Sequence, residues 1–217
     1  MSAAGSTRWQ RVATEDAGPS YAEAYAQRFA EAEAAGDDVH GEATFLAGLL
    51  GPGSRVLDAG CGTGRVAVRL AGLGHEVVGV DVDEAMLDVA RAAAPALTWR
   101  GVDLAALPAD LVGFDLVALA GNVVPLCETG TLPAVAAGCA GAVVPGGLVV
   151  SGFGLDADHL PDGCPVTSLT EWDAACAAAG LVLRQRYAGW DHATAGVPGD
   201  GYAVSVHVRA VASEERS

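Results

Sequence analysis

The chain has 217 residues, of which 51% are hydrophobic, and this length and composition predict one globular domain with or without an appendage. Its net charge of −15 disfavours nucleic acids and anionic membranes as partners, because binding either requires basic side chains opposite phosphate groups. All 12 basic residues are arginine, and the lack of lysine excludes both a Schiff base with pyridoxal phosphate and the P-loop of nucleotide triphosphatases.

The N-terminal quarter of the chain predicts a short helical region after a disordered start. Residues 1–19 are polar and are expected to be disordered. Ser20 begins an S-x-x-E capping box, which predicts a helix over 21–35. A second short helix is expected over 41–50, and together the two helices form a cap over residues 20–52.

From residue 53 to residue 210, apolar strands alternate with helices. The strands are expected at Arg55–Asp58, Glu76–Asp81, Leu97–Gly101, Phe114–Ala120, Leu148–Phe153, Leu181–Tyr187 and Tyr202–Arg209. The helices between them are expected at Gly64–Leu73, Asp83–Ala94, Thr131–Val143 and Ser168–Gly180, and residues 211–217 form a tail. This alternation predicts an α/β fold of three layers, in which a doubly wound, mostly parallel sheet of seven strands is covered by helices on both faces.

Ligands of such sheets bind outside the carboxyl ends of the strands. Two long polar loops, 154–167 and 188–201, leave from those ends or from the neighbouring strand. We therefore expect these loops to form walls of a substrate pocket.

A glycine-rich turn, DAGCGTG at 58–64, follows the first of these strands. Glycines allow a tight turn and a close approach of a ligand, and the following helix offers free N–H groups to an anionic group. Asp81 ends the second strand, where a carboxylate can accept hydrogen bonds from ribose hydroxyls. Asp103 follows the third strand and can accept a bond from a purine amino group. Arg65 occupies the position where a dinucleotide-binding G-x-G-x-x-G turn has its third glycine, so the spacing favours a different ligand.

Four segments, in this order, resemble the motifs of the class I S-adenosylmethionine-dependent methyltransferases. They read VLDAGCGTGR at 56–65, VVGVDVDEAML at 77–87, FDLVALAGN at 114–122 and PGGLVVSGF at 145–153. The resemblance implies a Rossmann-like methyltransferase domain over 53–210, whose last strand, within GYAVSVHV at 201–208, is antiparallel. It also implies S-adenosyl-L-methionine as the cofactor and S-adenosyl-L-homocysteine as the product.

The resemblance implies roles at the methionine end of the cofactor. Asp58 would order the turn and face the cofactor amino group, often through water. Ala120 and Asn122 would border the sulfonium. The methionine part would lie against the glycines of the turn, Gly60, Gly62 and Gly64.

At the adenosine end, the resemblance implies that Asp81 takes the ribose hydroxyls. Asp103 would accept from the adenine amino group, with the Leu104 N–H on a ring nitrogen, and Val82 and Met86 would pack near the adenine. The N-terminal helix resembles the capping helix of small-molecule members. The residues that would close over the cofactor are Tyr21, Tyr25, Arg28 or His40.

Two differences from related methyltransferase families bear on the class of acceptor and on whether a metal is needed. Enzymes that methylate amino groups of nucleic-acid bases carry Asn/Asp-Pro-Pro-aromatic after the fourth strand, whereas this chain has NVVP at 122–125. Metal-dependent catechol-type members need acidic residues after strands four and five, where this chain has AG at 120–121 and SGF at 151–153. We therefore expect a small-molecule acceptor, no nucleic acid and no metal.

Methyl transfer from a sulfonium depends mainly on proximity and orientation, which can lower a barrier by ~7–11 kcal/mol. A general base is needed only when the acceptor must lose a proton, and the candidates are His159, His192 and Asp156, ahead of His40. Two alternatives remain open at this point: a non-catalytic S-adenosylmethionine-binding protein and, less favoured, a nicotinamide-dependent oxidoreductase.

The remaining features concern compartment and assembly. The five cysteines form no C-x-x-C pair, and their odd number favours small buried side chains in a reducing compartment over disulfides or zinc. The first 20 residues lack the apolar segment of a signal peptide, and no apolar run has the length of a membrane span. These features predict a cytoplasmic protein, as a monomer or homodimer, without a membrane partner.

Overall fold

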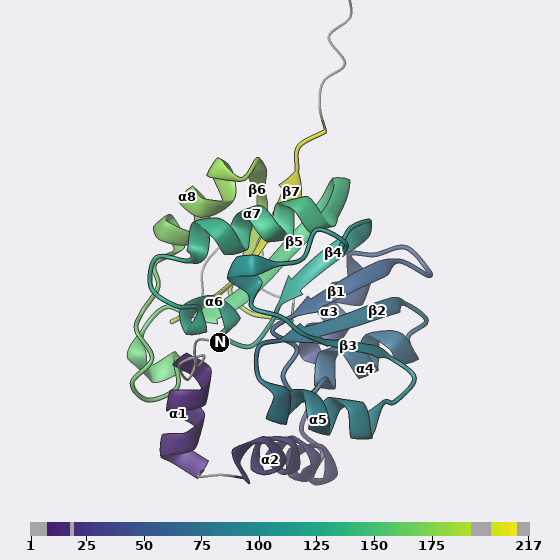
Figure 1. Ribbon diagram of the computed structural model, residues 1–217, viewed down its shortest axis with the longest axis vertical. Helices are drawn as coiled ribbons and strands as arrows, with labels where there is room; N and C mark the ends of the chain where they lie inside the picture. The colour runs from purple at the N-terminus through teal and green to yellow at the C-terminus, as the bar shows by residue number, and fades with distance from the viewer. Residues whose placement is uncertain (1–7, 18–19, 192–200, 212–217) are drawn as a thin grey trace, which may run out of the picture.

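The computed structural model describes residues 8–17, 20–191 and 201–211, which form a seven-stranded sheet between layers of helices (Figure 1). The strand order is β3-β2-β1-β4-β5-β7-β6. Neighbouring strands pair in parallel except at β7, which is antiparallel to β5 and to β6. The predicted fold class and the antiparallel last strand are thus confirmed. The strands are β1 (Arg55–Ala59), β2 (Glu76–Asp81), β3 (Thr98–Gly101), β4 (Phe114–Leu119), β5 (Val143–Gly154), β6 (Leu181–Tyr187) and β7 (Tyr202–Arg209).

Both faces of the central strands are buried, because successive residues of a strand point to opposite faces. Leu57 and Val117 belong to the core under α7 (Leu132–Ala142) and α8 (Leu169–Ala178). Their neighbours Val56 and Leu116 belong to the core under α3 (Gly41–Gly48) and α4 (Arg65–Gly72). Helix α5 (Glu84–Ala93) packs beside β2 and β3. Near-continuous apolar strands are therefore what this layered fold requires.

Side-chain caps begin two of the predicted helices. The Asp83 carboxylate accepts from Ala85 N at 3.0 Å before α5, and the Ser168 hydroxyl accepts from Glu171 N at 3.1 Å before α8. The predicted cap at Ser20 is wrong, since Ser20 makes no capping side-chain bond before α2 (Tyr21–Ala35). Its backbone, at φ −100° and ψ 25°, is outside the extended region typical of a capping residue.

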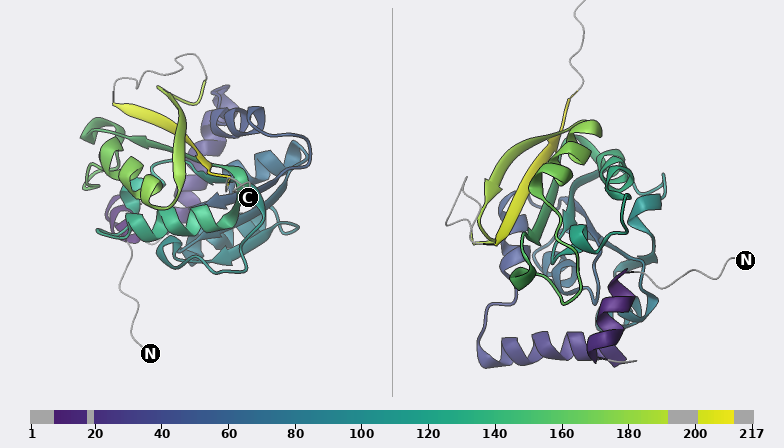
Figure 2. Two further views of the ribbon diagram at one scale, coloured as in Figure 1. Left: turned by 90° about the horizontal axis from the view of Figure 1, so that it is seen from above. Right: turned by 90° about the vertical axis from the view of Figure 1, so that its left-hand side faces the viewer.

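The N-terminal segment differs from its prediction. The polar residues 1–19 are expected to be disordered, whereas residues 8–17 form α1 (Arg8–Ala17), which lies with α2 at one end of the molecule (Figure 2). Trp9 contacts Tyr21 and Tyr25 edge-on, with ring centroids 6.3 and 5.8 Å apart. Docking onto α2 supplies the stability that the isolated polar segment lacks.

Short elements that the sequence analysis did not predict lie along the carboxyl edge of the sheet. They are η2 (Leu104–Ala106), α6 (Val123–Leu126) and η3 (Ala157–His159), of which η2 and η3 are single 3₁₀ turns. No helix in the described part of the chain is both long and apolar enough to cross a membrane.

Candidate active site

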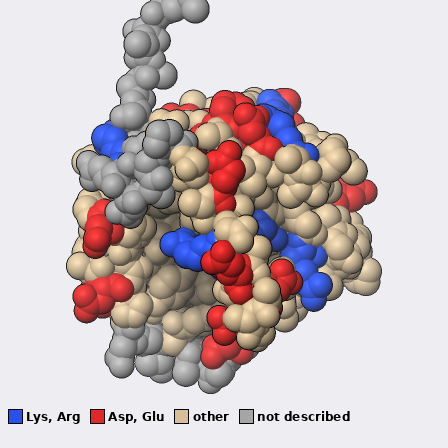
Figure 3. All heavy atoms as spheres, turned by 90° about the horizontal axis from the view of Figure 1, so that it is seen from below, with Lys and Arg blue, Asp and Glu red and all other residues tan. Residues whose placement is uncertain are grey.

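A cavity of about 230 Å³ lies between the carboxyl ends of β1, β2 and β4 and the side chains of α1 and α2. It opens at the end of the molecule where the sequence predicts a ligand crevice. The face seen from this end, in Figure 3, carries acidic and arginine side chains in alternation rather than a broad basic area. The lining includes residues from the glycine-rich turn, from the ends of β2 and β4, and from η2, α6 and α7.

The glycine-rich turn is folded as its composition requires. Gly60, Gly62 and Gly64 all have a positive φ angle, which residues with a side chain rarely adopt. A Cβ at Gly60 would lie 2.7 Å from a methyl carbon of Val123, and one at Gly64 would lie 2.5 Å from the ring of Trp99. The turn therefore needs glycine for its conformation and for its space. Gly60 and Gly62 line the cavity. Gly64 is not one of the lining residues and immediately precedes the first turn of α4.

Asp58 lies under this turn and lines the cavity. Its side chain is 2% exposed, and Oδ2 accepts from Ala67 N in α4 at 3.1 Å. Burial raises the pKa of the Asp58 carboxyl to about 7, although the Ala67 N–H and the Arg65 guanidinium favour the ionised form. A cationic ligand group at this point would further favour the ionised carboxylate.

Asp81 connects the end of β2 to the turn. One carboxylate oxygen accepts from Gly62 N at 2.8 Å and the other accepts from Asp83 N at 2.9 Å. Each oxygen can accept a further bond, so the fixed carboxylate can still receive two hydroxyl groups of a ligand in the cavity. Burial raises the pKa of Asp81, and the backbone N–H donors oppose this effect.

All four residues that are predicted to contact the adenine belong to the lining of the cavity. They are Val82, Met86, Asp103 and Leu104. Asp103 also accepts from Ala105 N at 2.9 Å, so its carboxylate caps η2 and is held in position by this bond. Apolar side chains beside a fixed carboxylate suit a flat heteroaromatic ring with an exocyclic amino group.

The sulfonium end differs in detail from the prediction. Ala120 lines the cavity, but Asn122 is not one of the lining residues and instead connects neighbouring segments. The Asn122 amide donates to His159 O at 3.1 Å and accepts from Gly154 N at 2.7 Å. Asn122 adopts a φ of 65°, a conformation that asparagine tolerates better than most residues.

The predicted general bases are not gathered in this cavity. His159 is absent from its lining, and its Nδ1 lies 2.7 Å from Asp156 Oδ1 in η3. His40 also lies outside, with Nε2 3.1 Å from Glu33. His192 is outside the described residues. No described residue of loops 154–167 or 188–201 lines the cavity, so the predicted loop walls are not found there.

Aromatic and charged side chains close the cavity on the side of α1 and α2. Trp9 and Tyr25 line it, whereas Tyr21 and Arg28, the other candidates for closure, do not. Arg65 also lines it, and its guanidinium donates to both oxygens of Glu42 at 2.9 and 2.5 Å. Its charge is thereby neutralised.

The electrostatic character of the lining is acidic. Four carboxylates and one guanidinium line the cavity: Asp58, Asp81, Asp103, Glu128 and Arg65. Among the described residues, no group of three or more histidine, cysteine or acidic side chains is arranged to hold a metal ion. The arrangement can hold a ligand with cationic, hydroxyl and amino groups.

Two parts of this site were not predicted from the sequence. Trp9 lies in the segment expected to be disordered, although Arg8, Trp9, Arg11 and Val12 repeat a polar and an apolar residue three positions apart, as an amphipathic helix does. The other part is the α6–α7 connection, whose Cys127, Glu128 and Thr131 carry no motif.

Comparison with known proteins identifies a matching family model, described as a methyltransferase domain, over residues 56–147. A solved TehB-like SAM-dependent methyltransferase from Corynebacterium glutamicum is 31% identical, covering 88% of this chain and 99% of that one with a TM-score of 0.78. The SAM-bound structure of CalS10, an amino pentose methyltransferase from Micromonospora echinaspora, is 21% identical and shares the fold over 83% of this chain and 95% of that one, with a TM-score of 0.65.

Among curated relatives, a putative methyltransferase from a Geobacillus strain is 60% identical over 42 residues. That match covers 19% of this chain and only 17% of the relative's length.

Proposed function

The chain belongs to the class I S-adenosylmethionine-dependent methyltransferases, and from this premise we propose that it transfers the cofactor's methyl group to a small acceptor that is neutral or positively charged. One observation carries the proposal: a single cavity, whose lining is acidic overall, joins the residues assigned to the cofactor to the aromatic side chains that α1 and α2 supply, Trp9 and Tyr25. The methyl group passes from the sulfonium to a nucleophile in line with the breaking bond, and S-adenosylhomocysteine leaves.

The cofactor assignment follows from groups that match its parts. Asp81 has free acceptor positions for the ribose hydroxyls, and Asp103 with Leu104 faces the adenine position. Asp58 lies near the glycine-rich turn, where it would face the amino group of the methionine part. With these pairings the sulfonium would lie toward Ala120, and the α1–α2 side of the cavity would be left to the acceptor.

The charge of the acceptor is inferred from that side of the cavity. Trp9 and Tyr25, whose ring centroids are 5.8 Å apart in an edge-on contact, both line the cavity, and aromatic faces attract cations. Because Glu42 neutralises Arg65, the lining offers an anionic acceptor no uncompensated cation. Burial raises the pKa of the Tyr25 hydroxyl, so this group stays a neutral hydrogen-bond donor.

None of the described residues that line the cavity is a histidine, so we propose that rate enhancement comes mainly from holding the acceptor in line with the methyl group. His159 and His192 remain proposals for a general base, needed only by acceptors that must lose a proton.

The test is release of S-adenosylhomocysteine from S-adenosylmethionine in the presence of matched amines, alcohols and carboxylic acids. We expect turnover with an amine or an alcohol and none with the carboxylic acid of the same skeleton. Fastest turnover on the acid would contradict the proposed acceptor class, and cofactor binding without turnover on any acceptor would favour the non-catalytic alternative.

A charge variant sharpens the test. Glu42→Gln removes the partner charge of Arg65 and should move the preference toward anionic acceptors. Glu76→Gln is the matched control, because Glu76 pairs with Arg55 at 3.5 Å, is 75% exposed and is not in the cavity lining. An unchanged preference in Glu42→Gln would show that the acceptor lies away from Arg65.

A further inference from the structure

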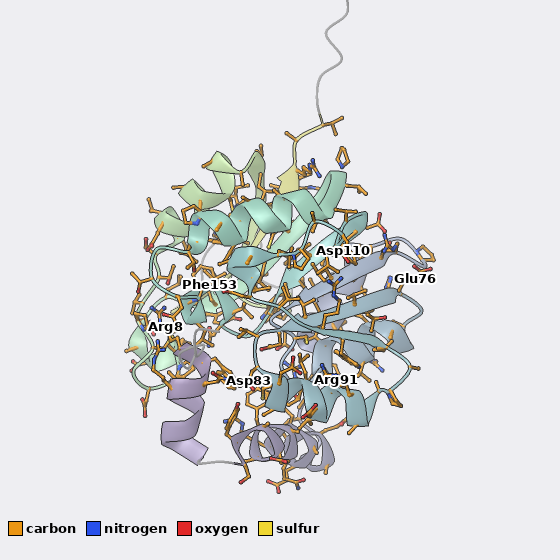
Figure 4. All side chains as sticks on the ribbon, in the orientation of Figure 1. Arg8, Glu76, Asp83, Arg91, Asp110 and Phe153 are labelled. Carbon is orange, nitrogen blue, oxygen red and sulfur yellow. The ribbon has the colours of Figure 1, made fainter. Side chains whose placement is uncertain are left out.

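A chain of buried hydrogen bonds runs from α2 to the glycine-rich turn. The Tyr21 hydroxyl donates to Asp83 Oδ2, the Asp83 backbone N–H donates to Asp81 Oδ1, and Asp81 Oδ2 accepts from Gly62 N. The three side chains are 8%, 1% and 9% exposed, so water competes little for these bonds. Figure 4 shows Asp83 at the start of α5, on the side facing α2.

Asp83 is held by two donors at once. Its Oδ1 accepts from Ala85 N and its Oδ2 accepts from Tyr21, and these two bonds fix both the side chain and the backbone at the start of α5. The direction of the Asp83 N–H follows from that backbone. This N–H is one of the two donors, at 2.9 and 2.8 Å, that orient the Asp81 carboxylate.

Helix α2 also makes an apolar contact with α5 beside this hydrogen-bond chain. Tyr21 and Ala22 form a separate apolar cluster with Met86 of α5, against which Trp9, Tyr25 and Val89 pack. Tyr21 therefore contributes both the apolar contact and the hydrogen bond at the junction.

We propose that Tyr21 is a positioning residue, which acts through Asp83 to orient the Asp81 carboxylate toward the ribose hydroxyls of the cofactor. This inference rests on the proposed cofactor placement. Docking of α2 thereby improves cofactor binding, and by linkage the bound cofactor stabilises the docked α2.

The experiment compares two ligands, S-adenosylhomocysteine and its 2′,3′-dideoxy analogue, by isothermal titration. Tyr21→Phe keeps the ring and removes only the donor. It should weaken S-adenosylhomocysteine by about 3- to 10-fold, the scale of one hydrogen bond, and the dideoxy analogue by less than about 2-fold. A role limited to folding would lower both affinities equally.

Asp83→Asn is a second variant that keeps a carbonyl oxygen for Ala85 N and should give the same ligand discrimination. Gln27→Ala is the matched control on α2, because its exposed amide bonds only within the helix, to Glu31 at 2.9 Å. It should change neither affinity. Thermal melting confirms that each variant is folded.

Asp81→Asn separates failure of this inference from failure of the cofactor placement. If Asp81→Asn weakens both ligands equally, the ribose lies elsewhere and both ideas are overturned. If Asp81→Asn discriminates between the ligands but Tyr21→Phe does not, only the positioning role is overturned. The double variant should bind no more weakly than Asp81→Asn alone, since Tyr21 acts through Asp81.

Discussion

Asp58 should make cofactor binding depend on pH near neutrality. The carboxyl is buried with one hydrogen bond, from Ala67 N at 3.1 Å, and burial raises its pKa to about 7. The positive amino group of the cofactor favours the ionised form when it lies near this carboxyl. Binding therefore selects the carboxylate, and a protein molecule that carries the proton must release it.

The expected size follows from that pKa. With a pKa of about 7, roughly one carboxyl in ten is ionised at pH 6 and roughly nine in ten at pH 8. The dissociation constant for S-adenosylhomocysteine should therefore rise about tenfold from pH 8 to pH 6. Titration calorimetry in buffers of different ionisation enthalpy should show nearly one proton released per ligand at pH 6 and almost none at pH 8.

Asp58→Asn is the control, because the amide oxygen can still accept from Ala67 N and the variant does not titrate. Its affinity should be weaker and constant from pH 6 to pH 8. A flat profile in the parent protein would refute the reasoning. The same slope in parent and variant would assign the proton to another group, of which Asp81 is the nearest candidate.

The same group has a predictable effect on folding. Because the folded-state pKa of Asp58 lies above its ordinary value of 3.8, the folded state binds this proton more tightly than the unfolded state. The resulting stabilisation is present below about pH 4 and is lost as pH rises toward 7, by up to roughly 4 kcal/mol. Asp58→Asn should remove this part of the pH dependence of the free energy of unfolding, measured in urea.

Three further outcomes are expected. Asp81→Ala should weaken S-adenosylmethionine by about 1.5–3 kcal/mol in calorimetry, the scale of a bond to a charged group, and an unchanged constant would place the ribose elsewhere. Ser151→Ala should lower the free energy of unfolding by about 1–3 kcal/mol, because it removes the hydroxyl oxygen that accepts from the buried Trp172 indole N–H at 2.9 Å. A loss below measurement error would show that Trp172 finds another acceptor. Duplex DNA or RNA should show no binding at physiological salt because of the net charge of −15, and micromolar affinity with a steep salt dependence would contradict this.

The sheet was predictable because its signal is local. The apolar run at Phe114–Leu119 and the turn at 58–64 are each contained in one short segment, and four such segments in order also indicate the family. The capping residues Asp83 and Ser168 were likewise predictable from adjacent residues. Ser20 was not, because its conformation depends on how α1 and α2 meet at the surface of the fold.

The walls of the cavity were less predictable, because they form between segments far apart in sequence. Arg8 donates to Pro125 O at 2.8 Å and to Thr129 Oγ1 at 2.8 Å, more than a hundred residues away, and no local pattern specifies such a contact. These bonds hold α1 beside α6, where Figure 4 shows Arg8. The prediction that the acidic loops form a pocket wall rested on their composition alone. In the structure, His159 and Asp156 at η3 contact each other instead.

The position of β7 has a consequence for synthesis of the chain on the ribosome. β7 comes last among the strands along the chain, yet it lies between β5 and β6 and supplies the partner of both. A nascent chain that stops before Tyr202 holds two strands with unpaired edges and an uncovered core, which are features that promote aggregation. Chaperone demand should therefore peak while residues 155–201 are being translated and fall once β7 has emerged, and a stop codon at 202 should yield insoluble protein even though every residue of the glycine-rich turn is present.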